Sequence, residues 1–113
     1  MEIKYKIWIE RDGKVIFGRG RDDILTAIES GHSLNAAARK LEMSYRAAWG
    51  RLRASEERMG LKLVEAGPHS KSIQLTPEAM AIIERFEKLE REMDVLASEA
   101  CREFQKLIPE KGE

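Results

Sequence analysis

The sequence predicts a mainly α-helical fold with a small amount of β-structure, and three observations support this prediction. Residues 30–60 contain two short amphipathic helical patterns joined by a tight turn, and each pattern opens with a polar residue. Two short strand patterns follow, one on each side of a turn at residues 67–69. A helical pattern then begins at Thr76 and meets no further helix-breaking residue until Pro109. Together these patterns predict a winged helix-turn-helix with an N-terminal β-hairpin and a long C-terminal dimerisation helix.

Residues 1–20 are predicted to form the β-hairpin. Residues 3–9 alternate between apolar and other side chains, as in a half-buried strand. The Asp-Gly pair at 12–13 tolerates the left-handed backbone of a tight turn, and residues 15–17 return as the second strand. Because an isolated hairpin is only marginally stable, this one is expected to pack on the helices or on a second copy of itself.

Residues 21–75 are predicted to form the winged helix-turn-helix itself. The Gly-Arg-Gly segment after the hairpin is expected to break the strand, so that the first helix begins near residues 21–22 and ends at Gly31. Ser33 and Ser44 are expected to cap the second and third helices, because a serine hydroxyl accepts a hydrogen bond from an otherwise unpaired backbone N–H.

The third helix, expected to end at Gly60, contains the predicted DNA-contacting face. One side repeats at the spacing of a core stripe, with Ala48, Leu52, Ser55 and Met59. The opposite side contains Arg46, Gly50, Arg53 and Glu57. An arginine can donate two hydrogen bonds to guanine in the major groove and can also reach phosphates. An arginine-rich helix face is often only a solvated surface, but the capped helices, the tight turn and the wing favour DNA binding here.

Aromatic residues on the same helix and the polar tip of the wing extend the candidate surface. Trp49 lies on the flank, where partial burial is favoured over stacking on a sugar, and Tyr45 lies near the rim of the core with a hydroxyl that can reach a phosphate. A wing normally reaches the phosphates or the minor groove beside the recognition helix. The candidate DNA-binding residues are Ser33, Ser44, Tyr45, Arg46, Trp49, Arg53, His69, Ser70 and Lys71.

The distribution of charge supports a DNA-facing lobe, although the formal net charge of the whole chain is zero. Residues 32–75 contain eight Lys or Arg and four Asp or Glu, a net charge of +4, whereas residues 76–113 contain six against ten, a net charge of −4. No apolar run approaches the ~20 residues of a membrane span, and the N-terminus lacks the apolar centre of a secretory signal. A cytoplasmic protein without membrane contact is therefore expected.

No catalytic, metal or cofactor site is predicted. Cys101 is the only cysteine, which excludes an intrachain disulfide and a cysteine zinc cluster, and it is expected to be a small packing residue. His32 and His69 are far apart in the sequence and have no cysteine partner. No Ser-His-Asp set, carboxylate pair or phosphate loop is recognisable, so an enzyme or a small-molecule sensor is disfavoured.

Residues 76–113 are predicted to form the long helix and a tail, with Thr76 as the cap and Pro77 at the first helical position. About 33 helical residues at ~1.5 Å each give roughly 50 Å, which one small domain cannot cover. A nearly heptad seam along this helix favours pairing with a second copy of the chain over packing within the monomer. The seam consists of Phe86, Leu89, Met93, Leu96, Ala100, Phe104 and Leu107.

These motifs also resemble a known family. The string SLNAAARKLEMSYRAAWGRLRASEERMG, followed by LKLVEAG and LTPEA, resembles the N-terminal winged-helix domain of the molybdate-dependent ModE regulators, and residues 43–49 are its most specific part. A broader resemblance is to the LysR-type DNA-binding domain, which has a similar Ala-Ala helix and Leu-Thr-Pro opening of the long helix. The resemblance implies a homodimer on a two-fold operator and regulation of transcription, often of metal-oxyanion uptake or use. It also implies recognition-helix roles for Ser44, Tyr45, Arg46, Trp49 and Arg53, and a wing at residues 69–71.

Two departures from the ModE pattern limit what the resemblance implies. The ModE regulators usually follow this domain with an oxyanion-binding module, whereas the sequence stops at Glu113, so molybdate sensing is not expected. Their wing is often glycine-rich, whereas this one is the short GPHSKS, from which fewer minor-groove contacts are expected. A sequence-specific, homodimeric transcription regulator that binds double-stranded DNA is the favoured function. The alternative is a winged-helix protein-interaction module that no longer binds DNA, and a separate sensor protein is left open.

Overall fold

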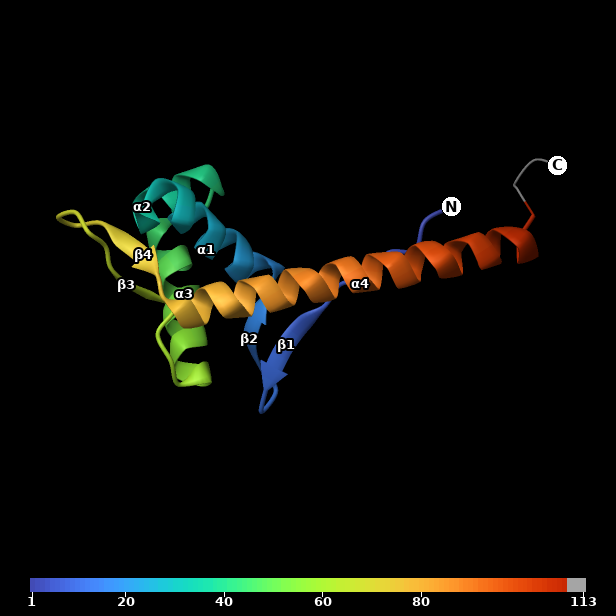
Figure 1. Ribbon diagram of the computed structural model, residues 1–113, viewed down its shortest axis with the longest axis horizontal. Coiled ribbons are helices and arrows are strands. Elements are labelled where there is room, and N and C mark those ends of the chain that lie inside the picture. Colours follow the sequence, from blue (N-terminus) through green and yellow to red (C-terminus); the bar gives the residue numbers. More distant parts are fainter. Residues whose placement is uncertain (110–113) are drawn as a thin grey trace.

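The computed structural model describes residues 1–109 and extends over 63 × 29 × 23 Å, because one long helix projects from a small helical body (Figure 1). β1 pairs with β2, and β3 with β4, in two separate antiparallel sheets. This arrangement confirms the predicted mainly helical fold, while residues 110–113 of the predicted last unit lie outside the described residues. The elements are, in order, β1 (Trp8–Arg11), β2 (Lys14–Gly18), α1 (Arg19–Gly31), α2 (Leu34–Lys40), α3 (Tyr45–Met59), β3 (Val64–Ala66), β4 (Ile73–Leu75) and α4 (Pro77–Leu107).

The N-terminal hairpin has the expected turn but a shorter first strand. Asp12 and Gly13 have positive φ angles of 53° and 78°, as a two-residue hairpin turn requires. The strand predicted at residues 3–9 is wrong in extent, since β1 is limited to four residues. The reason is that β2 ends at Gly18, which leaves residues 1–7 without a neighbouring strand to supply hydrogen bonds.

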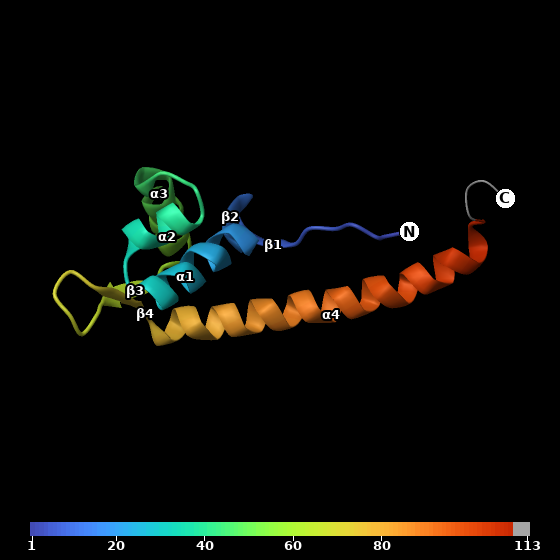
Figure 2. The ribbon, with the colours of Figure 1, turned by 90° about the horizontal axis from the view of Figure 1, so that it is seen from above.

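Residues 1–7 instead run beside α4, as both ribbon views show (Figures 1 and 2). The Tyr5 hydroxyl donates a hydrogen bond to the Asp94 carboxylate, and this bond raises the pKa of Tyr5 to about 12. The Cys101 thiol donates to the Met1 carbonyl oxygen, with a sulfur–oxygen distance of 3.3 Å. Cys101 therefore contacts the N-terminal segment and is only partly buried.

The first helix begins earlier than expected, because the Gly-Arg-Gly segment does not break the chain. Gly18 is the N-cap of α1, and a Cβ atom there would lie 3.1 Å from the Cβ of Trp8. At the other end, the left-handed residue is His32, with a φ angle of 57°, and not Gly31. A Cβ atom at Gly31 would lie 3.2 Å from the Cβ of Ala36, so this glycine permits the close approach of α2.

Local signals at the other helix ends are confirmed. The side-chain oxygens of Ser33, Ser44 and Thr76 each accept a hydrogen bond from the backbone N–H three residues later, at 3.0, 3.0 and 3.1 Å. Gly60 ends α3 in the left-handed conformation, and its N–H donates to the carbonyl oxygen of Glu56. These caps fix the start and the end of the candidate recognition helix.

The core joins the hairpin, the three short helices, the wing and the first part of α4. Phe17 from β2 packs edge-to-face on Phe86 from α4, with ring centroids 5.2 Å apart and an interplanar angle of 76°. The prediction that Phe86 begins a dimerisation seam is therefore wrong, since this side chain is 2% exposed and lies within the core of its own protomer. The hairpin brings Phe17 to α4, which a periodicity pattern within α4 does not reveal.

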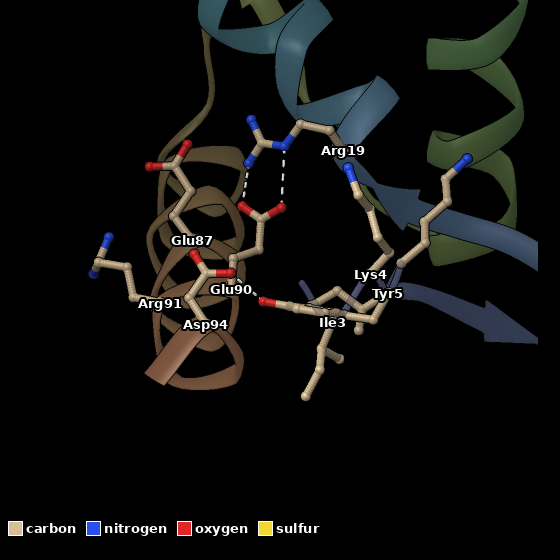
Figure 3. Close-up of a pocket in the computed structure, with 10 residues that line it drawn as sticks. Ile3, Lys4, Tyr5, Arg19, Glu87, Glu90, Arg91 and Asp94 are labelled. Carbon is tan, nitrogen blue, oxygen red and sulfur yellow. Dashed lines mark hydrogen bonds and ion pairs between the residues drawn. The ribbon is translucent and has the colours of Figure 1, made fainter. Parts of the chain in front are cut away.

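Arg19, which belongs to the segment expected to break the strand, joins α1 to α4. Its guanidinium contacts Glu90 on α4 (Figure 3) and both Asp22 and Asp23 on its own helix. Asp22 is completely buried, and one of its carboxylate oxygens has no hydrogen-bond partner among the described residues. Burial raises the pKa of Asp22 to about 7; Glu87 adds to this rise, and the charge of Arg19 opposes it.

The buried carboxyl group is expected to make the stability of the protein depend on pH. Since the pKa of Asp22 is raised in the folded state, the folded protein holds this proton between about pH 4 and pH 7 while the unfolded chain does not. Stability should therefore fall as the pH rises through this window. An asparagine cannot ionise, so Asp22→Asn should abolish the loss of stability that ionisation of Asp22 causes over this pH range. The melting temperature of this variant at pH 8 should exceed that of the parent by about 5 °C.

Thermal unfolding followed by circular dichroism at pH 5 and pH 8 measures this effect. Asp23→Asn is the matched control, because Asp23 also contacts Arg19, at 3.0 Å, but is only half-buried. The prediction would be contradicted if raising the pH from 5 to 8 lowered the melting temperature of Asp22→Asn as much as that of the parent.

Candidate nucleic-acid interface

The third helix lies on the side of the helical body that faces away from α4 (Figure 2). Ala48, Leu52 and Ser55 are completely buried, as the predicted core stripe requires, and Met59 is partly buried. Glu56, which the sequence did not identify, is also buried. The helix therefore presents only its opposite side to solvent.

That solvent-facing side contains the predicted arginines. Within residues 1–109, neither Arg46 nor Arg53 forms an ion pair or a hydrogen bond with another side chain or the backbone. Both side chains are exposed, and the Arg53 guanidinium lies 5.4 Å from the centre of the Trp49 ring. This cation–π contact leaves the guanidinium donors of Arg53 available to an outside acceptor.

The two aromatic residues on this helix are more exposed than the sequence predicts. Trp49 is 41% exposed and Tyr45 is 54% exposed, so neither ring fills the edge of the core. The adjacent Ala48 takes the core-facing position, and a rotation of about 100° per residue carries Trp49 to the surface. The exposed rings therefore lie beside the arginines of the same helix.

A positive cluster extends from this helix to α1. Arg21 on α1 donates a hydrogen bond to the Ser55 hydroxyl, with a nitrogen–oxygen distance of 3.2 Å. Burial lowers the pKa of Arg21, and the positive charges of Arg51 and Arg58 lower it further. Arg51 and Arg58 therefore lie close enough to Arg21 for their charges to act on it, and together the three arginines add positive potential beside α3.

The wing projects to one side of α3, at the end of the molecule opposite the C-terminus (Figure 1). Its base is fixed by the buried Glu56 carboxylate, which accepts a hydrogen bond from the Leu63 N–H at 2.8 Å. Its tip is closed by Ser72, whose hydroxyl contacts the backbone N–H and carbonyl of His69 at 3.0 and 2.7 Å. A Cβ atom at Gly67 would lie 2.4 Å from the Ser72 hydroxyl oxygen, so a larger residue there would displace the hydroxyl that contacts His69. The predicted tip residues His69, Ser70 and Lys71 are all exposed.

The structure brings only part of the predicted set onto one surface. Tyr45, Arg46, Trp49 and Arg53 share the exposed side of α3, whereas the wing tip extends separately. The hydroxyls of Ser33 and Ser44 are engaged as helix caps, and Ser33 is partly buried. In these caps each hydroxyl oxygen only accepts a hydrogen bond, so its O–H group can still donate to a phosphate.

The described residues contain no alternative site of comparable clarity. No three His, Cys, Asp or Glu side chains within residues 1–109 are grouped closely enough to hold a metal ion. A hollow of about 600 Å³ lies between the N-terminal segment and α4 (Figure 3), but side chains of both charge signs line it and pair with one another across it. No helix in the described part of the chain is long and apolar enough to cross a membrane.

Comparison with known proteins identifies what this arrangement resembles. Residues 23–80 match the family model described as bacterial regulatory helix-turn-helix protein, lysR family, which leaves the N-terminal hairpin outside the match. No curated protein matches the sequence significantly.

Three solved structures with a similar fold are two regulator DNA-binding domains and one full-length regulator. The BenM DNA-binding domain in complex with benA site 1 DNA has a TM-score of 0.58 and 25% identity, over 74% of this chain and 94% of that domain. The CbnR DNA-binding domain in complex with DNA has a TM-score of 0.61 and 19% identity, over 76% and 97%. Full-length LysG from Corynebacterium glutamicum has a TM-score of 0.58 and 20% identity, but the match covers 79% of this chain and only 30% of LysG.

Proposed function

Because this chain belongs to the LysR family of bacterial regulatory helix-turn-helix proteins, we propose that it regulates transcription by binding duplex DNA through α3 and the wing. The observation that most directly supports this function is the exposed pair Arg46 and Arg53, which have no hydrogen-bond or ion-pair partner within residues 1–109. The BenM and CbnR domains, which have the same fold, were solved as DNA complexes.

The proposed contacts divide into two classes. Arg46 and Arg53 reach the base edges of the major groove, since a guanidinium can donate two parallel hydrogen bonds to guanine. Tyr45 and Trp49 contact the sugar-phosphate backbone beside them, and the remaining proposed contacts also position the protein on the phosphates. These remaining residues are Ser33, Ser44, His69, Ser70 and Lys71.

The proposed regulator is a homodimer that pairs through α4. The helix has 31 residues and is therefore about 46 Å long, and its ion pair with Arg19 of α1 is formed by Glu90, before the midpoint of the helix. Leu96, Phe104 and Leu107 are 59%, 47% and 77% exposed, so an apolar stripe lacks a covering layer within the described residues. A second copy would cover it and set two recognition helices one or more DNA turns apart, at about 34 Å per turn. The proposed interface consists of Leu89, Met93, Leu96, Ala100, Phe104 and Leu107.

Two finer assignments accompany this proposal. The segment at residues 43–49 resembles the ModE recognition helix and favours a ModE-like regulator, with target genes for the uptake or use of metal oxyanions. The three units at residues 1–20, 21–75 and 76–113 are proposed to act as one structural domain, since a continuous core joins the first two to the start of the third.

Selection of binding sites from a random duplex library, together with light scattering of the protein, tests the proposed function. Enrichment of a palindromic site by a dimeric protein is the expected result, and the spacing of its half-sites gives the distance between the recognition helices. A protein-interaction module is the second candidate, which the zero net charge favours. Failure to retain any duplex even at low salt, where phosphate contacts are strongest, would exclude DNA binding and leave that second candidate.

A further inference from the structure

The N-terminal hairpin packs on the C-terminal end of the candidate recognition helix. The hairpin itself lies outside residues 23–80, which match the family. Two arginines exchange contacts across this junction. Arg11, beside the hairpin turn, donates to the carbonyl oxygens of Arg58 and Met59 at 3.0 and 3.4 Å. In return, Arg58 at the end of α3 donates to the carbonyl oxygen of Val15 in β2 at 2.6 Å.

This exchange has a physical reason at the end of a helix. The last four carbonyl groups of an α-helix have no partner within the helix, and they carry its partial negative charge. The Gly60 N–H and the Leu61 N–H both donate to the carbonyl of Glu56, so they leave the carbonyls of Arg58 and Met59 to another donor. Arg11 supplies that donor together with a full positive charge, while Arg58 ties the same turn of α3 to β2.

We propose that Arg11 and Arg58 are positioning residues for DNA binding, because they hold the last turn of α3 against the hairpin and so fix the direction in which Arg53 points. Arg53 lies less than two helical turns before Arg58 and Met59, the residues whose carbonyl groups Arg11 contacts. A base contact depends on the orientation of the guanidinium plane, so a small change in the helix axis lowers affinity. This inference rests on the proposed DNA binding through α3.

Two variants in the hairpin turn test whether Arg11 positions α3 or whether its positive charge alone contributes to DNA binding. Arg11→Ala removes the two hydrogen bonds to the end of α3 together with one positive charge. Lys14→Ala removes only a positive charge, at the position paired with Arg11 in the hairpin. Among the described residues, Lys14 makes no side-chain hydrogen bond or ion pair, so it is the matched control. Arg11→Ala is expected to bind a selected operator about tenfold more weakly than the parent, and Lys14→Ala is expected to bind like the parent.

The salt dependence of binding gives the decisive measurement. Removing one phosphate contact lowers the slope of log affinity against log salt by about 0.9, while removing a positioning residue leaves the slope unchanged. Arg11→Ala should therefore keep the slope of the parent, and Arg11→Lys should recover part of the affinity because an ammonium group still donates to a carbonyl. Parent-like affinity of Arg11→Ala would overturn the inference, and so would a slope lowered by about 0.9.

Binding is measured well below the melting temperature of each variant, so that unfolding does not account for a loss of affinity. If Arg11→Ala is not folded, Arg58→Ala makes the same comparison from the other side of the junction, because it removes the guanidinium that donates to the Val15 carbonyl, and it too should weaken binding without changing the slope. Failure of the parent itself to bind any selected duplex would be a failure of the proposed function. Failure of the variants alone to weaken binding would overturn only the positioning role.

Discussion

Replacing Arg46 and Arg53 together by alanine is expected to lower the affinity for a selected operator by roughly 30-fold to 10⁴-fold, at about 1–3 kcal/mol for each base contact removed. Both side chains are exposed on α3 and neither is held by a hydrogen bond or ion pair within residues 1–109, so their removal should not affect folding. The single variants should each relax the preference at different positions of the operator, which selection from a random library measures directly.

A control removes the same charge from elsewhere in the molecule. Arg91 and Arg102 are both exposed on α4, away from the recognition helix, and replacing both by alanine should change operator affinity far less. Equal affinities of the parent and of the variant lacking Arg46 and Arg53 would show that another surface contacts DNA. Equally weakened binding in the variant and in the control would indicate a general effect of net charge.

If the proposed dimer forms, substitution of Leu96 by glutamate is expected to weaken self-association by about 1000-fold, because each dimer would then bury two carboxylates in the proposed apolar seam. Leu96 is 59% exposed in the protomer, so the helical body should keep its fold and its melting temperature. Operator affinity should fall by about 100-fold or more, since two unlinked domains lack the effective concentration that a dimer provides.

Sedimentation measures the association, and a binding assay on the same samples measures the operator affinity. Val95→Glu is the matched control, because it adds the same charge at an exposed position one residue away, outside the proposed seam. A dimer that forms equally well with Leu96→Glu would contradict pairing through this seam. A dimer broken equally by both variants would indicate an interface on another side of α4.

The local features of the fold could be predicted from the sequence because their causes lie within a few residues. Ser33, Ser44 and Thr76 each cap a helix through a backbone N–H three residues later, and the turn at residues 12–13 needs only two residues with positive φ. The core side of the recognition helix was predictable for the same reason, since helical periodicity alone brings Ala48, Leu52 and Ser55 to one side.

The exposed rings and the long-range contacts were not predictable in the same way. Periodicity gives the angle of Trp49 on the helix, but the amount of its surface that neighbouring elements cover depends on where those elements lie. The burial of the Asp22 carboxyl group has a similar origin. The sequence has an acidic residue in the first turn of a helix, but tertiary packing removes this residue from water, and burial together with Glu87 of α4 raises its pKa.

The sequence by itself determined the order and type of the elements and the side of α3 on which Arg46 and Arg53 lie, because hydrogen bonds and periodicity over a few residues decide these features. Only the tertiary structure decided what the N-terminal hairpin does. It assigned Phe86 to the core, joined Arg19 to Glu90 across 71 positions, and joined Arg11 to Arg58 across 47 positions. Contacts between distant positions depend on how the elements pack together, and no local pattern encodes that packing in a single sequence.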